Sequence, residues 1–359
     1  MSSADAGFMR MALRLAARAR GTTLPNPMVG AVLVRNGRIV GRAYHSKAGL
    51  PHAEALALRQ AGPAANGSTL YVTLEPCSHT GRTPPCADAL VRAGVRRVLA
   101  AIVDPDPRVR GRGLRRLRSA GVSVSVGLLG EEARSLNEVF ITRMEKKRPF
   151  VTLKLAASLD GRIGVARGKA QWISGDSARR WTRTLRSQND AILVGINTVL
   201  ADDPLLTGLR TPVRVVLDSR LRTPARARLF RSKAPVWIAA GAGASKSKEL
   251  RLRKSGAEVL RLSGSNGRLS FPAVLKELSK RGISRLLIEG GGEVAASALE
   301  AKAVDRAVWV VAPKILGGGA VPAVAGKGSR SPERAVRLEQ VTVKRLGEDL
   351  VLQGRVRYP

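Results

Sequence analysis

The sequence predicts an α/β protein that folds as two domains, and three observations support this fold class. Short apolar segments typical of buried strands alternate with helical segments along nearly the whole chain. The length of 359 residues exceeds that of most single domains. A charged joint, RMEKKRPF at residues 143–150, separates two such alternating series. We therefore predict a first domain at residues 1–147 and a second at residues 148–359.

The first domain is predicted to begin with an amphipathic helix in FMRMALRLAARARG, residues 8–21. The pair Asn36-Gly37 between two apolar segments is typical of a two-residue β-hairpin turn. Pro84 and Pro85 precede a helical segment, where proline is favoured. The other predicted elements are helices at 52–62, 84–94, 111–121 and 131–148, and strands at 69–76, 95–104 and 122–129. Together they predict a three-layer α/β unit.

The second domain is predicted to be a larger α/β unit. Its first strand is expected at residues 150–161 and its first helix at residues 177–188. Residues 190–204 are predicted to form a strand that leads into a loop. Further strands are expected at 213–219, 234–241, 256–262 and 284–292, with helices between them, followed by terminal strands at 305–319 and 350–358.

The chain is strongly basic, with 62 Lys and Arg residues against 27 Asp and Glu and a formal net charge of +35. One interpretation is nucleic-acid binding. The other is a compositional bias combined with small anionic substrates. We favour the second, because the charge is spread along the chain and only 3% of the residues are aromatic, which leaves few platforms for stacked bases. We therefore predict a small-molecule substrate and no nucleic-acid partner; the sequence is also compatible with a homo-oligomer.

No apolar segment reaches the 18 residues of a membrane span, and no secretion signal is recognisable, so we expect a cytoplasmic protein. The Arg-rich N-terminal segment resembles a transit peptide in composition, but its periodicity fits the first helix of a domain. The chain has two cysteines, Cys77 and Cys86, in one short segment. Their spacing alone does not exclude a disulfide between them. Because no secretion signal is recognisable, metal binding is the better interpretation.

A metal site is predicted from two segments, HAEALALRQAG at 52–62 and TLEPCSHTGRTPPC at 73–86. Catalytic zinc sites use three protein ligands and leave one position for water. His52, Cys77 and Cys86 provide such a set. A nearby carboxylate that is not a ligand can take up and return a proton, and Glu54 lies two residues from His52. We therefore predict zinc on His52, Cys77 and Cys86, with Glu54 as the catalytic residue.

Three alternatives accompany this prediction. His52 and Glu54 could be surface residues of a helix, with the cysteines as buried filler. His79 is the rival ligand, but it follows Cys77 too closely to bind the same ion, so we place it either around the metal ligands or in the substrate pocket. His45 lacks any ligand context and is interpreted as structural or substrate-facing.

These motifs carry a resemblance. The His-Ala-Glu sequence, followed by Pro-Cys and a later cysteine, resembles the zinc-dependent cytidine-deaminase superfamily. The long insert CSHTGRTPPC, with TTLPNPMVGAVLV upstream, resembles the bifunctional deaminase/reductase family of riboflavin biosynthesis, over nearly the whole chain. The resemblance implies a cytidine-deaminase-like domain followed by a dihydrofolate-reductase-like domain that uses NADPH. It also implies a phosphorylated ribosylaminopyrimidine substrate, which is deaminated and then reduced from ribosyl to ribityl.

The second domain offers a weaker signal of its own. LLIEGGGEVAASAL at 286–299 is predicted to be a strand, a glycine-rich turn and a helix, an arrangement that lets backbone N–H groups approach a phosphate. The motif is not G-x-G-x-x-G, so the alternative that the glycines only form a turn and bind no ligand is not excluded. The segments at 153–164 and 198–207 are predicted loops at strand ends, where α/β sites usually form.

The resemblance implies the site residues of the second domain. The residues implied to border the cofactor are Ala156, Trp172, Thr198, Asp202, Ser219, Gly291, Gly292, Glu293, Val294, Ala295, Ala296 and Ser297. Those implied to border the substrate are Lys154, Ala170, Arg186, Leu206, Arg210 and Glu289. Two positions depart from the family pattern: Ala170 stands where serine is common, and LTGLR is one residue longer before Arg210. Rival functions are a nucleic-acid deaminase and an enzyme whose reductase half is inactive.

Overall fold

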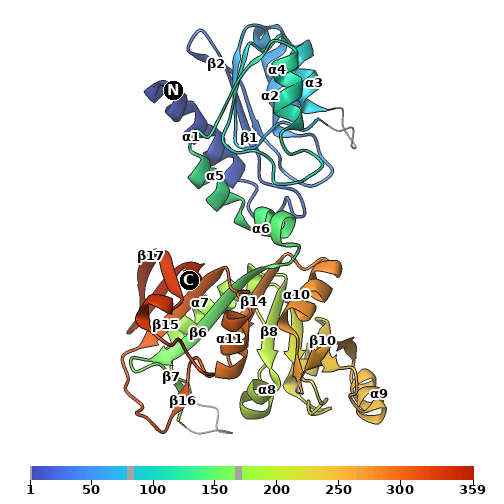
Figure 1. The fold of residues 1–359 in the computed structure, drawn as a ribbon, viewed down its shortest axis with the longest axis vertical. Helices are drawn as coiled ribbons and strands as arrows, with labels where there is room; N and C mark the ends of the chain where they lie inside the picture. Colours follow the sequence, from blue (N-terminus) through green and yellow to red (C-terminus); the bar gives the residue numbers. More distant parts are fainter. Residues whose placement is uncertain (1, 79–84, 166–171, 266) are drawn as a thin grey trace. The chain divides into compact units, whose positions relative to one another are not determined.

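The computed structural model describes residues 2–78, 85–165, 172–265 and 267–359 of the chain (Figure 1). The chain divides into two compact units, Met1–Lys147 and Arg148–Pro359. Each unit has its own sheet and its own hydrophobic core. Within the described ranges, no helix is long and apolar enough to cross a membrane.

The N-terminal unit is built on a five-stranded sheet in the order β2-β1-β3-β4-β5. β1 runs antiparallel to both of its neighbours, whereas β3, β4 and β5 are parallel. The strands are β1 (Gly30–Arg35), β2 (Arg38–Tyr44), β3 (Thr69–Val72), β4 (Arg97–Ala100) and β5 (Ser123–Val126). The helices are α1 (Ser3–Ala17), α2 (Ala53–Ala61), η1 (Gly62–Ala65), α3 (Cys86–Arg92), α4 (Arg112–Ser119), α5 (Gly130–Leu136) and α6 (Glu138–Lys146). The segments that follow β3 and β4 therefore leave the sheet at the same edge.

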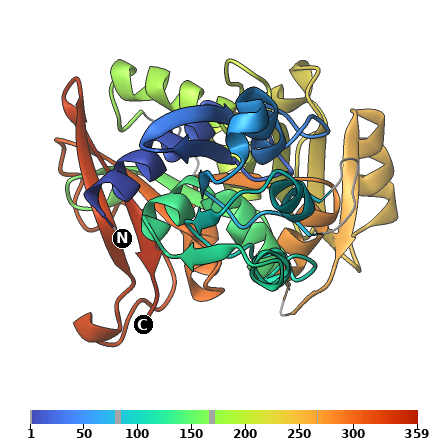
Figure 2. The ribbon, with the colours of Figure 1, turned by 90° about the horizontal axis from the view of Figure 1, so that it is seen from above.

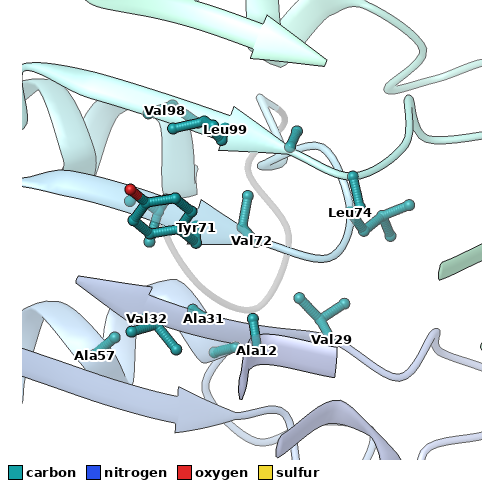
Figure 3. Packing of buried hydrophobic residues seen from close by; sticks show 14 of the residues in the cluster. Ala12, Val29, Ala31, Val32, Ala57, Tyr71, Val72, Leu74, Val98 and Leu99 are labelled. Atoms are coloured by element: carbon teal, nitrogen blue, oxygen red, sulfur yellow. The ribbon is translucent and has the colours of Figure 1, made fainter. Parts of the chain in front are cut away.

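Helices α1 and α2 pack directly on the antiparallel part of this sheet. A Cβ atom at Gly30 of β1 would lie 2.0 Å from the carbonyl oxygen of Ala12 in α1. A Cβ atom at Gly41 of β2 would lie 2.2 Å from the carbonyl oxygen of Ala57 in α2. Glycine at these two positions therefore allows the close helix–strand approach. Figure 3 shows Ala12 and Ala57 among the buried apolar side chains of this core.

The helix predicted at residues 131–148 is divided into α5 and α6, so the prediction of one long helix was wrong. The interruption is at Asn137, whose side-chain Oδ1 accepts the Met28 N–H at 2.8 Å. Its Nδ2 donates to the Met28 carbonyl at 2.9 Å. Asparagine competes with the helix in this way because its short side chain can bond to backbone groups. The break therefore results from a tertiary contact.

The C-terminal unit contains a nine-stranded sheet in the order β11-β10-β9-β8-β14-β6-β15-β18-β17. The first seven strands in this order are parallel, and β18 and β17 are antiparallel to their neighbours. Its strands are β6 (Phe150–Ser158), β8 (Ala191–Gly195), β9 (Val213–Leu217), β10 (Val236–Gly241), β11 (Ala257–Leu262), β14 (Arg285–Glu289), β15 (Arg306–Ala312), β17 (Arg337–Leu346) and β18 (Asp349–Arg357). Figure 2 shows the β17–β18 hairpin, in red, at one end of the sheet and the yellow strands with α9 at the other.

Helices and short elements complete this unit. The helices are α7 (Asp176–Ser187), α8 (Ile196–Asp202), η2 (Arg228–Arg231), α9 (Lys246–Lys254), α10 (Phe271–Lys280), α11 (Gly292–Glu300) and η3 (Pro332–Arg334). Two small ladders are formed by β7 (Arg162–Gly164) with β16 (Val321–Pro322) and by β12 (Gly264–Ser265) with β13 (Arg268–Leu269). Two predictions are corrected here. Residues 196–202, expected to continue a strand and loop, form α8, and the edge strand β17 was not predicted at all.

Candidate active sites

Three side chains that can bind a metal converge near the C-terminal end of β3, one of the parallel strands of the N-terminal sheet. His52 is the N-cap residue of α2, Cys77 follows β3, and Cys86 is the first residue of α3. The His52 Nδ1 atom lies 3.3 Å from Cys86 Sγ and 3.6 Å from Cys77 Sγ. All three ligand atoms lie within 4.8 Å of one another. The two cysteines are not joined by a disulfide.

Backbone hydrogen bonds connect the two cysteine segments. The Cys86 N–H, at the start of α3, donates to Cys77 Sγ at 3.4 Å. The Ala87 N–H donates to the Cys77 carbonyl oxygen at 3.0 Å. The first N–H groups of a helix have no partner within the helix, and they favour negative charge. The start of α3 therefore stabilises a thiolate at Cys77.

The electrostatics of the two sulfurs favour a bound cation. A hydrogen bond from the Cys86 thiol lowers the pKa of Cys77 to about 4, and the same contact raises the pKa of Cys86. The pair therefore favours a thiolate at Cys77, whose negative charge attracts a cation. Two sulfurs and one imidazole nitrogen are the ligand types that zinc prefers, and three ligands leave a fourth position open. The residues present therefore fit a catalytic zinc ion.

Glu54 lies in the first turn of α2 and is only 3% exposed. Burial, followed by the negative charge of Cys77, raises the pKa of its carboxyl to about 7. It is not one of the three converging ligands. A buried carboxyl with a pKa near neutrality can both accept and return a proton.

His45 is buried beside this site, and its partner Asn26 was not singled out from the sequence. Asn26 Nδ2 lies 3.1 Å from His45 Nε2, and His45 Nδ1 lies 3.1 Å from the Pro51 carbonyl oxygen. The His45 ring meets the His52 ring edge-on, with centroids 5.4 Å apart. Asn26 lies in the segment TTLPNPMVGAVLV, which entered the sequence analysis only through the family resemblance and did not predict this contact. His79 lies outside the described residues.

In the C-terminal unit, three charged residues predicted to border the substrate lie together. Glu289 ends β14 and is paired in register with Lys154 on β6. Arg186 of α7 donates from Nε and Nη2 to the two Glu289 carboxylate oxygens, each at 2.7 Å. Its Nη1 donates to the Thr207 carbonyl at 3.1 Å. Burial lowers the pKa of Lys154, and although burial raises the pKa of Glu289, Arg186 and Lys154 bring it below its ordinary value.

The glycine-rich turn lies at the same edge of the sheet. Gly290 and Gly291 have φ angles of +81° and +80°, and Gly291 is the N-cap residue of α11. A Cβ atom at Gly291 would lie 3.3 Å from Thr198 Oγ1 and 3.7 Å from Val294 Cγ2. The structure therefore brings Thr198 of α8 and the first turn of α11 against this turn.

Other predicted cofactor residues on α11 have partners within the helix or core. The Ala295 N–H donates to the Gly291 carbonyl at 3.0 Å. Ser297 Oγ donates to the Glu293 carbonyl at 2.8 Å. Ala295 and Ala296 are buried. The N–H groups of the first turn, at residues 292–294, are the ones that the helix itself leaves without partners.

The remaining predicted residues of the C-terminal unit are less tightly connected. Trp172 is 76% exposed, and the Arg179 guanidinium carbon lies 4.6 Å from its ring centroid. Burial raises the pKa of Asp202, the last residue of α8. Ser219 Oγ donates to the Gly267 carbonyl at 2.9 Å.

Leu206 is buried with a φ of +52°, whereas Arg210 is exposed and is held through its N–H by Ser187 Oγ at 3.1 Å. Ala156 is half-buried in the middle of β6, opposite Val310. Ala170 lies outside the described residues. Among the described residues, no hydrogen bond or ion pair joins Arg210 to Arg186 or Glu289.

Comparison with known proteins gives a consistent result for both units. The cytidine and deoxycytidylate deaminase zinc-binding region matches residues 2–102, and the RibD C-terminal domain matches residues 149–352. The riboflavin biosynthesis protein RibD of Aquifex aeolicus is 44% identical over 354 residues, which cover 97% of each chain.

Solved structures agree over the full length. RibD of Acinetobacter baumannii, in its form 1, has a TM-score of 0.83 at 36% identity and covers 99% of each chain. A diaminohydroxyphosphoribosylaminopyrimidine deaminase/5-amino-6-(5-phosphoribosylamino)uracil reductase of Thermotoga maritima has a TM-score of 0.80 at 34% identity, again covering 99% of each chain.

Proposed function

This chain belongs to the RibD family of riboflavin-biosynthesis enzymes, and from that membership we propose which of its residues perform each of the two reactions. It is a bifunctional enzyme with a zinc-dependent deaminase and an NADPH-dependent reductase. The predicted fold class, a cytidine-deaminase-like domain followed by a dihydrofolate-reductase-like domain, is confirmed. We assign deamination to residues 1–147 and reduction to residues 148–359.

The deaminase reaction is assigned to His52 and Glu54 at the start of α2, together with Cys77 and Cys86 after β3. His52, Cys77 and Cys86 would hold zinc, which supplies a Lewis acid that makes water more acidic. The substrate is 2,5-diamino-6-(5-phosphoribosylamino)pyrimidin-4-one. Glu54 accepts a proton from the attacking water and returns it to the departing amino group, so that ammonia leaves and a carbonyl remains. Its raised pKa of about 7 suits both transfers.

The reductase reaction is assigned to the edge of the C-terminal sheet. NADPH supplies the hydride that converts the ribosyl side chain to ribityl. Support for the cofactor position comes from the turn at Gly290 and Gly291, where backbone N–H groups of the first turn of α11 face outward from the helix end. Lys154, with Arg186 and Glu289 as a fixed ion pair beside it, would hold the substrate.

Three wider proposals follow from the same assignment. The partner is a small phosphorylated pyrimidine, and neither a membrane nor a nucleic acid is needed for the reaction. The compartment is the cytoplasm, because two ligand cysteines require a reducing environment. A homo-oligomer is compatible with this assignment but is not required by either site.

The observation that carries the deaminase assignment is the convergence of His52, Cys77 and Cys86 beside buried Glu54. The test is to incubate the full-length enzyme with the diaminopyrimidine phosphate, with and without NADPH, and to identify the products by mass spectrometry. We expect ammonia and the deaminated intermediate without NADPH, and a product with two more hydrogens when NADPH is present. Elemental analysis should find about one zinc per chain. A zinc-free preparation that still deaminates would contradict the assignment.

A further inference from the structure

Glu75 lies between β3 and Cys77 in the sequence and is only 3% exposed, and backbone N–H groups surround its carboxylate. Its Oε2 accepts from Asp104 at 3.1 Å and from Gly111 at 2.9 Å. Its Oε1 accepts from Gly113 at 2.9 Å and from Leu114 at 3.3 Å. Four backbone donors on one buried carboxylate show that it has a specific position in the fold.

Three of the four donors lie at the start of α4, a helix without a side-chain cap of its own, and the fourth, Asp104, lies in the segment between β4 and α4. Gly111 is the N-cap residue of α4 and offers no side-chain acceptor, and the first turn of α4 contains no acidic residue. The first N–H groups of a helix need acceptors, and a negative charge there is stabilising. Glu75 supplies both the acceptor oxygens and the negative charge. The N-terminus of α4 is therefore capped by a residue from the segment after β3.

The same contact presses α4 onto the backbone that leads to Cys77. A Cβ atom at Gly113 would lie 1.9 Å from the Pro76 carbonyl oxygen, which belongs to the Pro76–Cys77 peptide. The Glu75 N–H donates to the Ile102 carbonyl at 3.0 Å. Beyond this point, Cys77 is fixed by the start of α3. The segment from Glu75 to Cys77 is therefore held at both ends.

We propose that Glu75 is a positioning residue for the metal ligand Cys77. Its carboxylate holds the first turn of α4 against the Pro76–Cys77 peptide, which sets where Cys77 Sγ lies relative to His52 and Cys86. The proposal rests on the assignment of these three residues as the zinc ligands. Since Glu75 reaches the metal through the backbone, its removal should change the geometry and strength of metal binding as well as stability.

The test compares Glu75→Gln with Asp5→Asn in the full-length protein. Asp5 is a matched control because it is also a buried carboxylate that caps a helix, α1, and it lies in the same unit. Each protein is loaded with Co²⁺ in place of zinc. The visible spectrum, the metal affinity from chelator competition and the thermal midpoint are then measured.

We expect Glu75→Gln to weaken metal binding by about tenfold or more and to shift the Co²⁺ spectrum. Its amide retains one acceptor oxygen but turns an NH₂ group toward backbone donors. Asp5→Asn should lower the thermal midpoint and leave metal affinity and spectrum unchanged. Glu75→Asp, which keeps the charge on a shorter side chain, should give an intermediate affinity, and it decides the question alone where Glu75→Gln does not fold.

If the folded Glu75 variants keep the metal affinity and the Co²⁺ spectrum of the wild type, the proposal is overturned, and Glu75 serves only as a helix cap. Cys77→Ser separates this failure from failure of the metal site itself. Weakened Co²⁺ binding in Cys77→Ser together with unchanged Glu75 variants would overturn only the positioning role. Unchanged Co²⁺ binding in Cys77→Ser would overturn the assignment of the ligands, and the positioning role with it.

Discussion

Glu54 combines three properties at one position: it is buried, it lies in the first turn of α2, and its pKa is raised to about 7. Glu54→Gln keeps the shape of the side chain but removes its ability to carry a proton. We expect ammonia release to fall by about 10²- to 10⁴-fold, the usual contribution of a general acid–base.

The same Glu54→Gln sample provides its own control. Oxidation of NADPH with the already deaminated intermediate should continue at the wild-type rate, because the proposed reductase residues belong to the other unit. A parallel loss of both activities in a folded variant would contradict the assignment of the two reactions to separate sites.

Lys154 predicts a pH dependence of stability. Burial lowers its pKa below the ordinary value of 10.5, so its charged form is less stable in the folded protein than in the unfolded chain. Between the lowered pKa and 10.5, the unfolded chain binds more protons, and the free energy of unfolding rises with pH. Lys154→Met should therefore stabilise the protein most at neutral pH, and this gain should shrink as the pH rises toward 10.5.

Thermal midpoints of the Lys154→Met variant and the wild type, measured at pH 7 and pH 10, test this expectation. Lys280→Met is the matched control, since Lys280 is an exposed lysine at the end of α10. A stability gain in Lys154→Met that is equal at both pH values would contradict the expected cause. Loss of reduction in the same variant would support a role of Lys154 in substrate binding.

Residue type explains which parts of the sites could be predicted from the sequence. The chain has 3 His and 2 Cys, so the spacing of His52, Cys77 and Cys86 is informative by itself. Glu75 and Asn26 could not be predicted in this way. Glu75 accepts from backbone N–H groups some 30 to 40 residues away, and every residue except proline carries such a donor, so residue types do not reveal the contact.

At the level of elements, the geometry of the turn before α11 leads to a prediction for Gly291. Gly291 has a φ of +80°, so any side chain there is strained, and a Cβ atom would lie 3.3 Å from Thr198 Oγ1. Gly291→Ala should lower stability by about 1–3 kcal/mol through backbone strain. If first-turn N–H groups bind the NADPH phosphate, it should also weaken NADPH binding by about tenfold or more, since each charge-assisted hydrogen bond contributes about 1.5–3 kcal/mol.

Gly282→Ala is the control for strain alone, because Gly282 has a φ of +86° and no atom within 4 Å of the added Cβ. Binding titrations and thermal midpoints on both variants separate the two effects. A lowered midpoint with unchanged NADPH affinity in Gly291→Ala would remove this turn from the cofactor site.

Elements with a buried face could be predicted, and those without one could not. β8 and β14 are almost fully buried and appear in the sequence as apolar runs. β17 is exposed along nearly its whole length, so RLEQVTVKRL lacks the alternation that marks a half-buried strand. Residues 196–202 were predicted wrongly because INTVLAD is short and apolar, a composition that fits either strand or helix.

For the whole molecule, the sequence indicates two α/β units but not the order of their strands. β14 lies between β8 and β6 in the sheet, although about 130 residues separate it from β6 in the chain. This crossover places Glu289 beside Lys154 and lets α7 bring Arg186 to both. The reductase residues therefore depend on a long-range pairing that local patterns do not encode.

The net charge of +35 leads to a prediction for the molecule as a whole. If the charge reflects composition, RNA should bind weakly at physiological salt, and its affinity should fall steeply as salt rises, because such binding depends on released counterions. Fluorescence titrations with a structured RNA at several salt concentrations measure this. Replacing two exposed arginines of α4, Arg115 and Arg118, by glutamate should weaken RNA binding as much as replacing Lys248 and Arg251 of α9 by glutamate. Sub-micromolar affinity for one RNA sequence, abolished by only one of these pairs, would instead identify a nucleic-acid site.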